Sequence, residues 1–285
     1  MTLIQILILS AVQGAAELLP VSSSAHVIVI AKMMGLDPTT PEMTLLLVML
    51  HTGTMFAVIC YFWKSWKATF FASRQQFLAA FKMIVLATIF TGVVGLTLKK
   101  LIEHFILGSV PHAEIEMLFG NLGLISASLA AVGLLIIYSG LRNRGADGRP
   151  ELGLGHCSVI GAVQGLCLPF RGFSRSGATI SAGLVMGVSR MRAEEFSFAL
   201  AVVLTPVVIL REAMRFLKTQ GAALHNGSLL PLFYPSLLGM LFSFIAGLLA
   251  LAWLSRWLER GRWQYFGIYC LCASLAVFLL YRNGF

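Results

Sequence analysis

The chain has 285 residues, of which 58% are hydrophobic and only 12% are Asp, Glu, Lys or Arg. An average soluble domain carries about twice that charged fraction, so the composition excludes a soluble globular enzyme, and its high hydrophobicity excludes a disordered chain. Lys and Arg outnumber Asp and Glu by 21 to 12, but no basic run interleaved with aromatic residues indicates a nucleic-acid partner. Such an excess is typical of loops beside anionic membrane lipids. We expect an all-α polytopic membrane protein.

Eight apolar regions follow one another along the chain. The first and the fifth, residues 3–36 and 155–190, are each interrupted in the middle by Pro, Ser and Gly. Irregular backbone at membrane depth must be buried in protein or line a wet cavity, so we expect each region to be a re-entrant helical hairpin. The other six reach the roughly 20 residues that a transmembrane helix needs. They are residues 43–63, 77–98, 116–140, 195–217, 230–255 and 264–281.

The two hairpins resemble each other in sequence. Ala-Val-Gln-Gly occurs at residues 11–14 and again at 162–165, and the serines at 22–24 have a counterpart at 174–176. A hairpin returns to its starting side and three spans cross to the other, so the second copy enters the membrane upside down. Broken helices of inverted repeats commonly meet near the midplane. The sequence therefore predicts one integral membrane domain, 1–285, with an inverted-topology repeat: repeat one at 1–145 and repeat two at 150–285.

Basic residues in the joints predict the orientation. In this topology one side collects most of the Lys and Arg residues that lie between spans, among them Lys64, Lys67, Arg74, Arg142 and Arg256. The positive-inside rule makes the richer side cytoplasmic. Both termini are then expected to face away from the cytoplasm.

Glu17 is the only charged residue among the first 31. A charge at the bilayer centre costs about 3 kcal/mol on insertion scales, so such residues are usually functional. Gln13 lies four residues earlier, on the same helical face, and a carboxylate beside an amide can orient water, a hydroxyl group or a metal ion. The alternative is that Glu17 is a structural contact that hydrogen-bonds a neighbouring helix.

The first helix break follows this acid. Pro20 is expected to end the helix, and Ser22, Ser23 and Ser24 precede an apolar run with His26 in its first turn. A serine at a helix start caps backbone N–H groups, and these groups together with the helix dipole attract anions. Capping accounts for one serine, but not for three serines and a His beside a buried Glu.

The second break carries the opposite charge. Arg171 and Arg175 are the only charged side chains between residues 152 and 189, and arginine offers a planar fork of donors suited to phosphate oxygens. The small and polar residues around them indicate a loop that encloses an anion: Gly172, Ser174, Ser176, Gly177 and Thr179. A structural Arg175–Glu17 ion pair is an alternative that is compatible with anion binding.

Together the breaks supply a nucleophile or general base opposite an oxyanion clamp, which is the arrangement expected for phosphoryl transfer. In a bilayer this arrangement indicates a phosphate carried by a lipid. A secondary transporter or lipid flippase is the alternative, because inverted repeats and broken helices also favour transport. A non-catalytic scaffold is a third option, but it leaves the buried polar residues unexplained.

Two longer motifs extend this interpretation. QGAAELLPVSSSAH at 13–26 is similar to a Glu/Gln-x-x-x-Glu motif with downstream serines and His, and RGFSRSGAT at 171–179 resembles the signature Pro-Gly-x-Ser-Arg-Ser-x-x-Thr. Both are signatures of the bacterial undecaprenyl-diphosphate phosphatases linked to bacitracin resistance. The resemblance implies hydrolysis of undecaprenyl diphosphate to the monophosphate, which recycles the carrier lipid for peptidoglycan and other cell-wall polymers. It also implies the cell inner (plasma) membrane, a site facing the periplasm, and a divalent cation, Mg²⁺ or Ca²⁺.

The residues and the resemblance together lead to a hypothesis for the role of each candidate. The catalytic candidates are Glu17, Ser23, His26 and Arg175, with Ser23 or His26 as nucleophile or general acid/base. The substrate-binding candidates are Gln13, Ser22, Gly172, Ser174, Ser176, Thr179 and Arg171. Glu17 with Gln13 is expected to hold the cation or to activate the attacking group. The residues leave open whether serine, histidine or water attacks the phosphorus.

Two positions depart from the family pattern. Gln13 stands where many members have Glu, and the loss of that carboxylate weakens the expected cation site. Arg171 stands where the second signature has Pro, and it either adds a phosphate contact or marks a paralogue that acts on another lipid phosphate.

Overall fold

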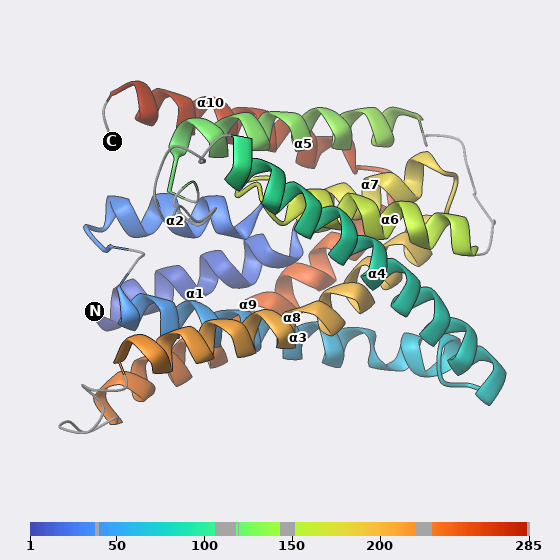
Figure 1. Ribbon diagram of the computed structural model, residues 1–285, viewed down its shortest axis with the longest axis horizontal. Helices are drawn as coiled ribbons and strands as arrows, with labels where there is room; N and C mark the ends of the chain where they lie inside the picture. Colours follow the sequence, from blue (N-terminus) through green and yellow to red (C-terminus); the bar gives the residue numbers. More distant parts are fainter. Residues whose placement is uncertain (38–39, 106–117, 119, 143–151, 221–229, 284–285) are drawn as a thin grey trace.

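A computed structural model describes residues 1–37, 40–105, 118, 120–142, 152–220 and 230–283, and the regular structure in these residues is helical, without strands. The predicted all-α fold is confirmed in this part of the chain. The helices are α1 (Leu3–Leu18), α2 (Ser23–Met33), α3 (Pro41–Thr69), α4 (Arg74–Phe105), α5 (Leu122–Arg142), α6 (Leu154–Cys167), α7 (Arg175–Val185), α8 (Arg190–Gln220), α9 (Leu230–Glu259) and α10 (Gln264–Arg282) (Figure 1).

Within the described residues, five helices are long and apolar enough to cross a membrane, so the protein is a multi-pass membrane protein. They are Leu45–Thr69, Arg74–Phe105, Leu122–Arg142, Tyr234–Trp257 and Gln264–Arg282. The sixth predicted span, 195–217, lies within α8, a 31-residue helix that contains Pro206. Some of its side chains lie outside the described residues. On α4 the apolar side chains of Phe81, Ile89 and Leu96 are more than half exposed, as expected for a face toward lipid.

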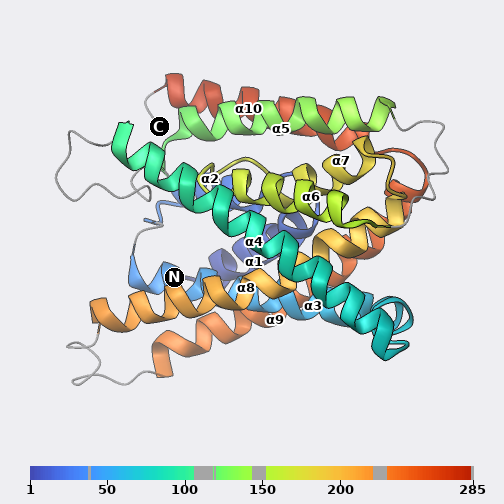
Figure 2. The same cartoon turned by 45° about the vertical axis from the view of Figure 1, so that its right-hand side comes forward.

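Both halves of the chain have the same order of elements. Two short helices, α1 and α2, precede the long α3, α4 and α5, and the short α6 and α7 precede α8, α9 and α10. Each predicted hairpin thus consists of two short helices, and the segment between them contains the Pro and Ser residues of the break. The short helices α2, α6 and α7 lie between the α5–α10 pair and the layer that contains α3, α8 and α9 (Figure 1 and Figure 2).

The contact between α5 and α10 is reciprocal. The Ser126 hydroxyl donates to the Ser274 carbonyl at 2.9 Å, and the Ser274 hydroxyl donates to the Ser126 carbonyl at 2.8 Å. Gly133 and Gly267 likewise face each other's carbonyl oxygens. A contact of this kind is what a two-fold relation between the halves requires. The inverted repeat and its boundaries remain a prediction.

Small residues bring the other helices close together. α1 packs against α9, and α6 packs against α4. A Cβ atom on Gly161 of α6 would overlap the backbone of Ala87 on α4. Helices in membranes commonly associate through such small residues, because glycine lets the backbones approach. The close packing holds α1 and α6, which lead into the two breaks, at fixed positions.

Candidate active site

The two helix breaks touch each other in the middle of the molecule. The Ser176 hydroxyl at the start of α7 donates to the Leu19 carbonyl at the end of α1, at 3.3 Å. Leu18 and Val21 of the first break belong to the same buried apolar cluster as Ala178 and Ile180 of α7. Residues separated by more than 150 positions in the sequence are therefore brought to one place.

Glu17 lies at the centre of the contact between the breaks. Its Oε1 accepts a hydrogen bond from Arg175 Nη2 at 2.9 Å, and only 15% of the Glu17 side chain is exposed. Its Oε2 accepts from Ser23 Oγ at 2.5 Å and from Gln13 Nε2 at 3.1 Å. The predicted stacking of Gln13 and Glu17 on one helical face is thus seen as a hydrogen bond. Charge-assisted bonds of this type are the short and strong ones.

The first break places Ser23 on this carboxylate through an unusual turn. Helix α1 ends because Leu19 is extended before Pro20. Ser22 then has φ +68°, and it is the only non-glycine residue with positive φ in the described part of the chain. Such a conformation costs about 1–3 kcal/mol and is typical of functional sites. Helix α2 begins immediately afterwards at Ser23.

The expectation that a serine caps the helix after the first break is wrong, although a serine caps the helix after the second break. Ser174 does cap α7, since its hydroxyl accepts from Gly177 N at 3.2 Å. Ser22 makes no capping bond to α2, and its hydroxyl pairs instead with that of Ser24 at 3.3 Å. The reason is the left-handed turn at Ser22, which does not have the extended backbone of an ordinary N-cap. The first turn of α2 thus keeps N–H groups that the Ser22 side chain does not occupy.

In the second break, Arg175 is held through its backbone. Thr179 Oγ1 donates to the Arg175 carbonyl at 2.8 Å and shares a 2.6 Å hydrogen bond with Ser197 of α8. Gly172 has φ +97°, and a Cβ there would lie 2.6 Å from the Ile125 carbonyl of α5, so only glycine fits this turn.

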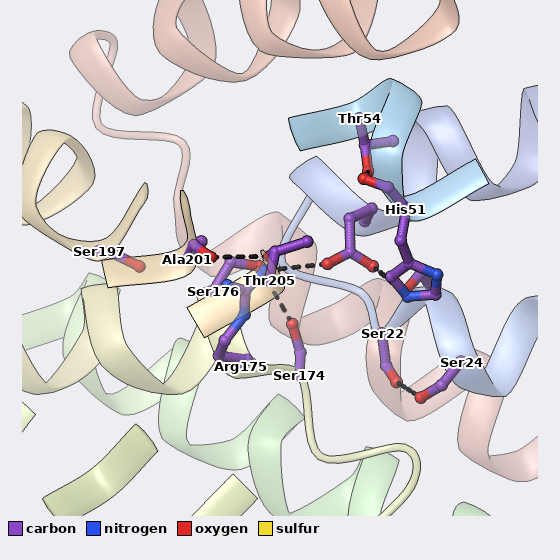
Figure 3. A network of polar contacts seen from close by, with 12 residues as sticks. Ser22, Ser24, His51, Thr54, Ser174, Arg175, Ser176, Ser197, Ala201 and Thr205 are labelled. Atoms are coloured by element: carbon purple, nitrogen blue, oxygen red, sulfur yellow. Dashed lines mark hydrogen bonds and ion pairs between the residues drawn. The ribbon is translucent and has the colours of Figure 1, made fainter. Parts of the chain in front are cut away.

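The other members of the loop lie nearby. Ser174 and Ser176 are buried beside Arg175, with their hydroxyls 3.4 Å apart, and Figure 3 shows both near the arginine. Arg171 is partly buried in the same loop. Its expected phosphate contact stays a prediction.

His26 is close to the site but outside the hydrogen-bond network of Glu17. Its Nδ1 bonds the Ser22 carbonyl at 2.8 Å, and its Nε2 bonds the Tyr269 hydroxyl of α10 at 2.8 Å. Of the four catalytic candidates, the structure joins Glu17, Ser23 and Arg175 directly and connects His26 to them only through the Ser22 turn.

Comparison with known proteins identifies the family. The family model described as bacitracin resistance protein BacA matches residues 6–276. The chain belongs to this family. It is 59% identical over 285 residues to undecaprenyl-diphosphatase 2 of Acinetobacter baylyi, with 98% of both chains covered. Undecaprenyl-diphosphatases of Rhodopirellula baltica and Desulfosudis oleivorans are 31% and 34% identical, with 98% and 94% of both chains covered. The resemblance carried by the two breaks is confirmed over nearly the whole chain.

In this member of the BacA family, three polar residues without an assigned role also lie at the site: His51, Thr54 and Thr205. His51 of α3 has Nε2 3.6 Å from Glu17 Oε2, and its Nδ1 bonds the Leu47 carbonyl at 2.7 Å. Figure 3 shows His51 facing the site from the side opposite Arg175. Thr54 of α3 and Thr205 of α8 line a crevice with Glu17 and Arg175. The signal for His51 in the sequence was that it is the one histidine of the apolar span 43–63.

Both polar and apolar side chains line the crevice. Its polar lining is Glu17, Arg175, Thr54 and Thr205, and its apolar lining is Leu18, Met55, Val58, Phe198, Ala201 and Val202. The apolar side chains come from α1, α3 and α8. The lining brings charged and apolar side chains together, but the crevice has a volume of only about 10 Å³, which is room for about one water molecule.

The expected pair Glu17 and Gln13 does not fit a resident divalent cation. Both Glu17 oxygens already accept hydrogens, and Gln13 turns its nitrogen toward the carboxylate. Among the described residues, no group of three or more His, Cys, Asp or Glu side chains is placed to hold a metal ion. A divalent cation on Glu17 would also lie close to the Arg175 guanidinium. Two like unit charges about 4 Å apart near a protein surface repel by about 4 kcal/mol, and a doubly charged ion is repelled more strongly.

Proposed function

We propose that the protein is an integral membrane phosphatase that hydrolyses undecaprenyl diphosphate to undecaprenyl phosphate and inorganic phosphate. The observation that carries the proposal is the Ser23 hydroxyl held on the Glu17 carboxylate, with the Arg175 guanidinium on the same carboxylate. A hydroxyl bonded to a base beside a cation is the arrangement of an activated nucleophile next to an anion clamp. The family and the names of its relatives support the same substrate.

Arg175 and the start of α7 bind the diphosphate in this mechanism. The guanidinium exchanges the Glu17 carboxylate for phosphate oxygens, to which it can donate two parallel hydrogen bonds. Ser174, Ser176 and the first N–H groups of α2 and α7 surround the same charge. The isoprenoid chain extends along the apolar side chains that line the crevice, and the crevice must widen to admit it.

Ser23 is the nucleophile and Glu17 is its base. The Ser23 oxygen attacks the terminal phosphorus while its proton passes to Glu17 Oε2, and the bond from that phosphorus to the bridging oxygen breaks. Undecaprenyl phosphate leaves with the electron pair of that bond and takes the proton from Glu17, which becomes a carboxylate again. Water then attacks the phosphoserine, Glu17 takes a proton from the water, and inorganic phosphate departs with the Ser23 oxygen protonated again.

We propose that the cation, Mg²⁺ or Ca²⁺, enters only together with the diphosphate. The charge of the diphosphate removes the repulsion from Arg175, and Mg²⁺ is commonly bound by one or two carboxylates plus substrate phosphates rather than by a complete protein cage. When bound, the cation neutralises phosphate charge. The roles of Ser23, Glu17 and Arg175 are described above without it.

We propose the bacterial inner membrane as the location, with the site open toward the periplasm. The predicted topology places most basic joints on the other side, and the substrate is a membrane lipid. A transporter, flippase or paralogous lipid phosphatase is not favoured, because the similar proteins are named undecaprenyl-diphosphatases.

The test is phosphate release from undecaprenyl diphosphate by the purified protein in detergent. We expect Ser23→Ala and Glu17→Gln to lower kcat about 100-fold or more, since each removes a partner of the nucleophile–base pair. Ser24→Ala is the matched control, because Ser24 bonds only Ser22 in this network, and its rate should stay within about threefold of wild type. Acid quenching during turnover should leave phosphate on Ser23.

Full activity of folded Ser23→Ala would contradict a serine nucleophile. The absence of phosphate release by the wild-type protein, at any cation concentration, would contradict the proposed function itself. Size-exclusion profiles of each variant separate a loss of chemistry from a loss of fold.

A further inference from the structure

We propose that Tyr269 is a positioning residue for this reaction: its hydroxyl orients His26, and His26 holds the turn that presents Ser23 to Glu17. The proposal rests on the proposed function. Tyr269 lies on α10, and its hydroxyl reaches a residue 243 positions earlier in the chain.

Both nitrogens of the His26 ring have partners. The Ser22 carbonyl can only accept, so the 2.8 Å contact requires that Nδ1 carry the hydrogen. In the neutral ring Nε2 then has a lone pair, which accepts from the Tyr269 hydroxyl at 2.8 Å. The two rings also stack, with centroids 5.6 Å apart and planes inclined by 14°. Together these contacts fix the tautomer and the orientation of the imidazole.

The carbonyl that His26 holds belongs to the strained residue of the site. Ser22 has φ +68°, a conformation that persists only where neighbouring groups determine it. Its side chain bonds Ser24 and does not cap α2. The backbone N–H of His26 reaches the Ser22 carbonyl at 3.4 Å, a longer contact than the 2.8 Å contact of the His26 ring. The Nδ1–H of His26 is the side-chain donor that reaches the Ser22 carbonyl in the described structure. Ser23 follows directly, and its hydroxyl reaches Glu17 at 2.5 Å.

Tyr269 lies on a helix whose position is fixed by its packing against α5. Helix α10 is joined to α5 by the reciprocal Ser126–Ser274 hydrogen bonds. At the start of α2, Ala25 belongs to the same buried cluster as Ile125 of α5 and Val277 of α10. The hydroxyl of Tyr269 therefore connects the turn before α2 to the α5–α10 pair.

Loss of the Tyr269 hydroxyl should lower kcat more than it changes KM. Without it the His26 ring can rotate away from the Ser22 carbonyl, and Ser23 spends less time on Glu17. Within the described structure the hydroxyl of Tyr269 bonds His26, whereas Arg175 and the start of α7 bind the diphosphate in the proposed mechanism. One neutral hydrogen bond contributes about 1 kcal/mol, so we expect Tyr269→Phe to lower kcat about fivefold to tenfold and to leave KM within twofold.

The experiment is a double-mutant cycle with phosphate release from undecaprenyl diphosphate as the readout. We expect Tyr269→Phe to lower kcat in the wild-type background and to have no further effect in His26→Ala, because its action passes through His26. His26→Asn, whose amide N–H can replace Nδ1–H, should recover part of the rate lost in His26→Ala. Tyr265→Phe is the control: Tyr265 is one turn earlier on α10, is half exposed, and contacts Trp257 instead.

A second readout does not depend on turnover. Amide hydrogen exchange in the peptide that covers residues 19–27 should be faster in Tyr269→Phe and in His26→Ala, and unchanged in Tyr265→Phe. Wild-type rates in Tyr269→Phe, or an equal loss of rate in both backgrounds, would overturn the proposal. Unchanged exchange in Tyr269→Phe would overturn it as well, even in a protein that proved inactive on undecaprenyl diphosphate.

Discussion

At the scale of single residues, the hydrogen-bond donors around Glu17 determine what this carboxylate can do. Ser23, Gln13 and Arg175 all direct hydrogens at one carboxylate. A carboxylate in such a position is held as an anion that can receive the Ser23 proton. The same donors leave little room for a metal ion, because its charge would replace or repel theirs.

Gln13→Glu should convert this site into one that binds a divalent cation without substrate. The change adds a second carboxylate four residues before Glu17, and paired carboxylates favour hard cations. With Mn²⁺ as the probe and electron paramagnetic resonance as the measurement, we expect the wild-type protein to retain Mn²⁺ only when methylene diphosphonate is present. Gln13→Glu should retain it in both conditions, with an affinity at least tenfold higher in the absence of diphosphonate.

Tight Mn²⁺ binding by the wild-type protein alone, abolished in Glu17→Gln, would contradict the entry of the cation with the substrate. Glu103→Gln controls for general surface charge, since Glu103 pairs with Lys99 on α4.

At the scale of helices, glycine decides how closely the elements of the two halves approach. Gly161 of α6 faces the backbone of Ala87, whereas Gly92 of α4 has nothing within 4 Å of the position of a Cβ atom. The two glycines have the same intrinsic helix propensity, so their contacts alone should distinguish them.

Gly161→Ala should therefore destabilise the protein although alanine is the better helix former. Overpacking costs about 1–3 kcal/mol, which corresponds to a fall in melting temperature of about 3–10 °C for a chain of this size. Gly92→Ala should leave the melting temperature unchanged or raise it. Intrinsic fluorescence during heating in detergent measures both, and equal melting temperatures for the two variants would refute the packing argument.

The helices and their breaks could be predicted wherever neighbouring residues in the sequence indicate them. Pro20 and the serines mark the first break, and the length of each apolar run gives a span. Glu17 and Arg175 stood out because charges are scarce near them. Tyr269 could not be found in this way, because tyrosine is unremarkable in an apolar helix and its partner His26 is distant in sequence. Ser22 also gave no sign of its left-handed turn, since serine usually adopts the extended backbone of an ordinary cap.

For the whole molecule, the orientation in the membrane remains a prediction that one helix can test. Arg74 and Lys100 lie near opposite ends of α4, and both are exposed. With the basic side in the cytoplasm, Lys100→Cys should react with a membrane-impermeant maleimide in intact cells, after outer-membrane permeabilisation and in a background without the native cysteines. Arg74→Cys should react only after the inner membrane is opened. The reverse labelling pattern would invert the topology.

The ion pair between Glu17 and Arg175 has a consequence for the resting protein. The carboxylate occupies the guanidinium that the proposed mechanism assigns to phosphate, so the protein contains its own competing anion. A ligand must displace Glu17 to bind, and a diphosphate with a long hydrocarbon chain gains enough from its other contacts to do so. Free inorganic phosphate lacks those contacts. Product inhibition by phosphate should accordingly be weak, and the arginine remains neutralised inside the membrane between turnovers.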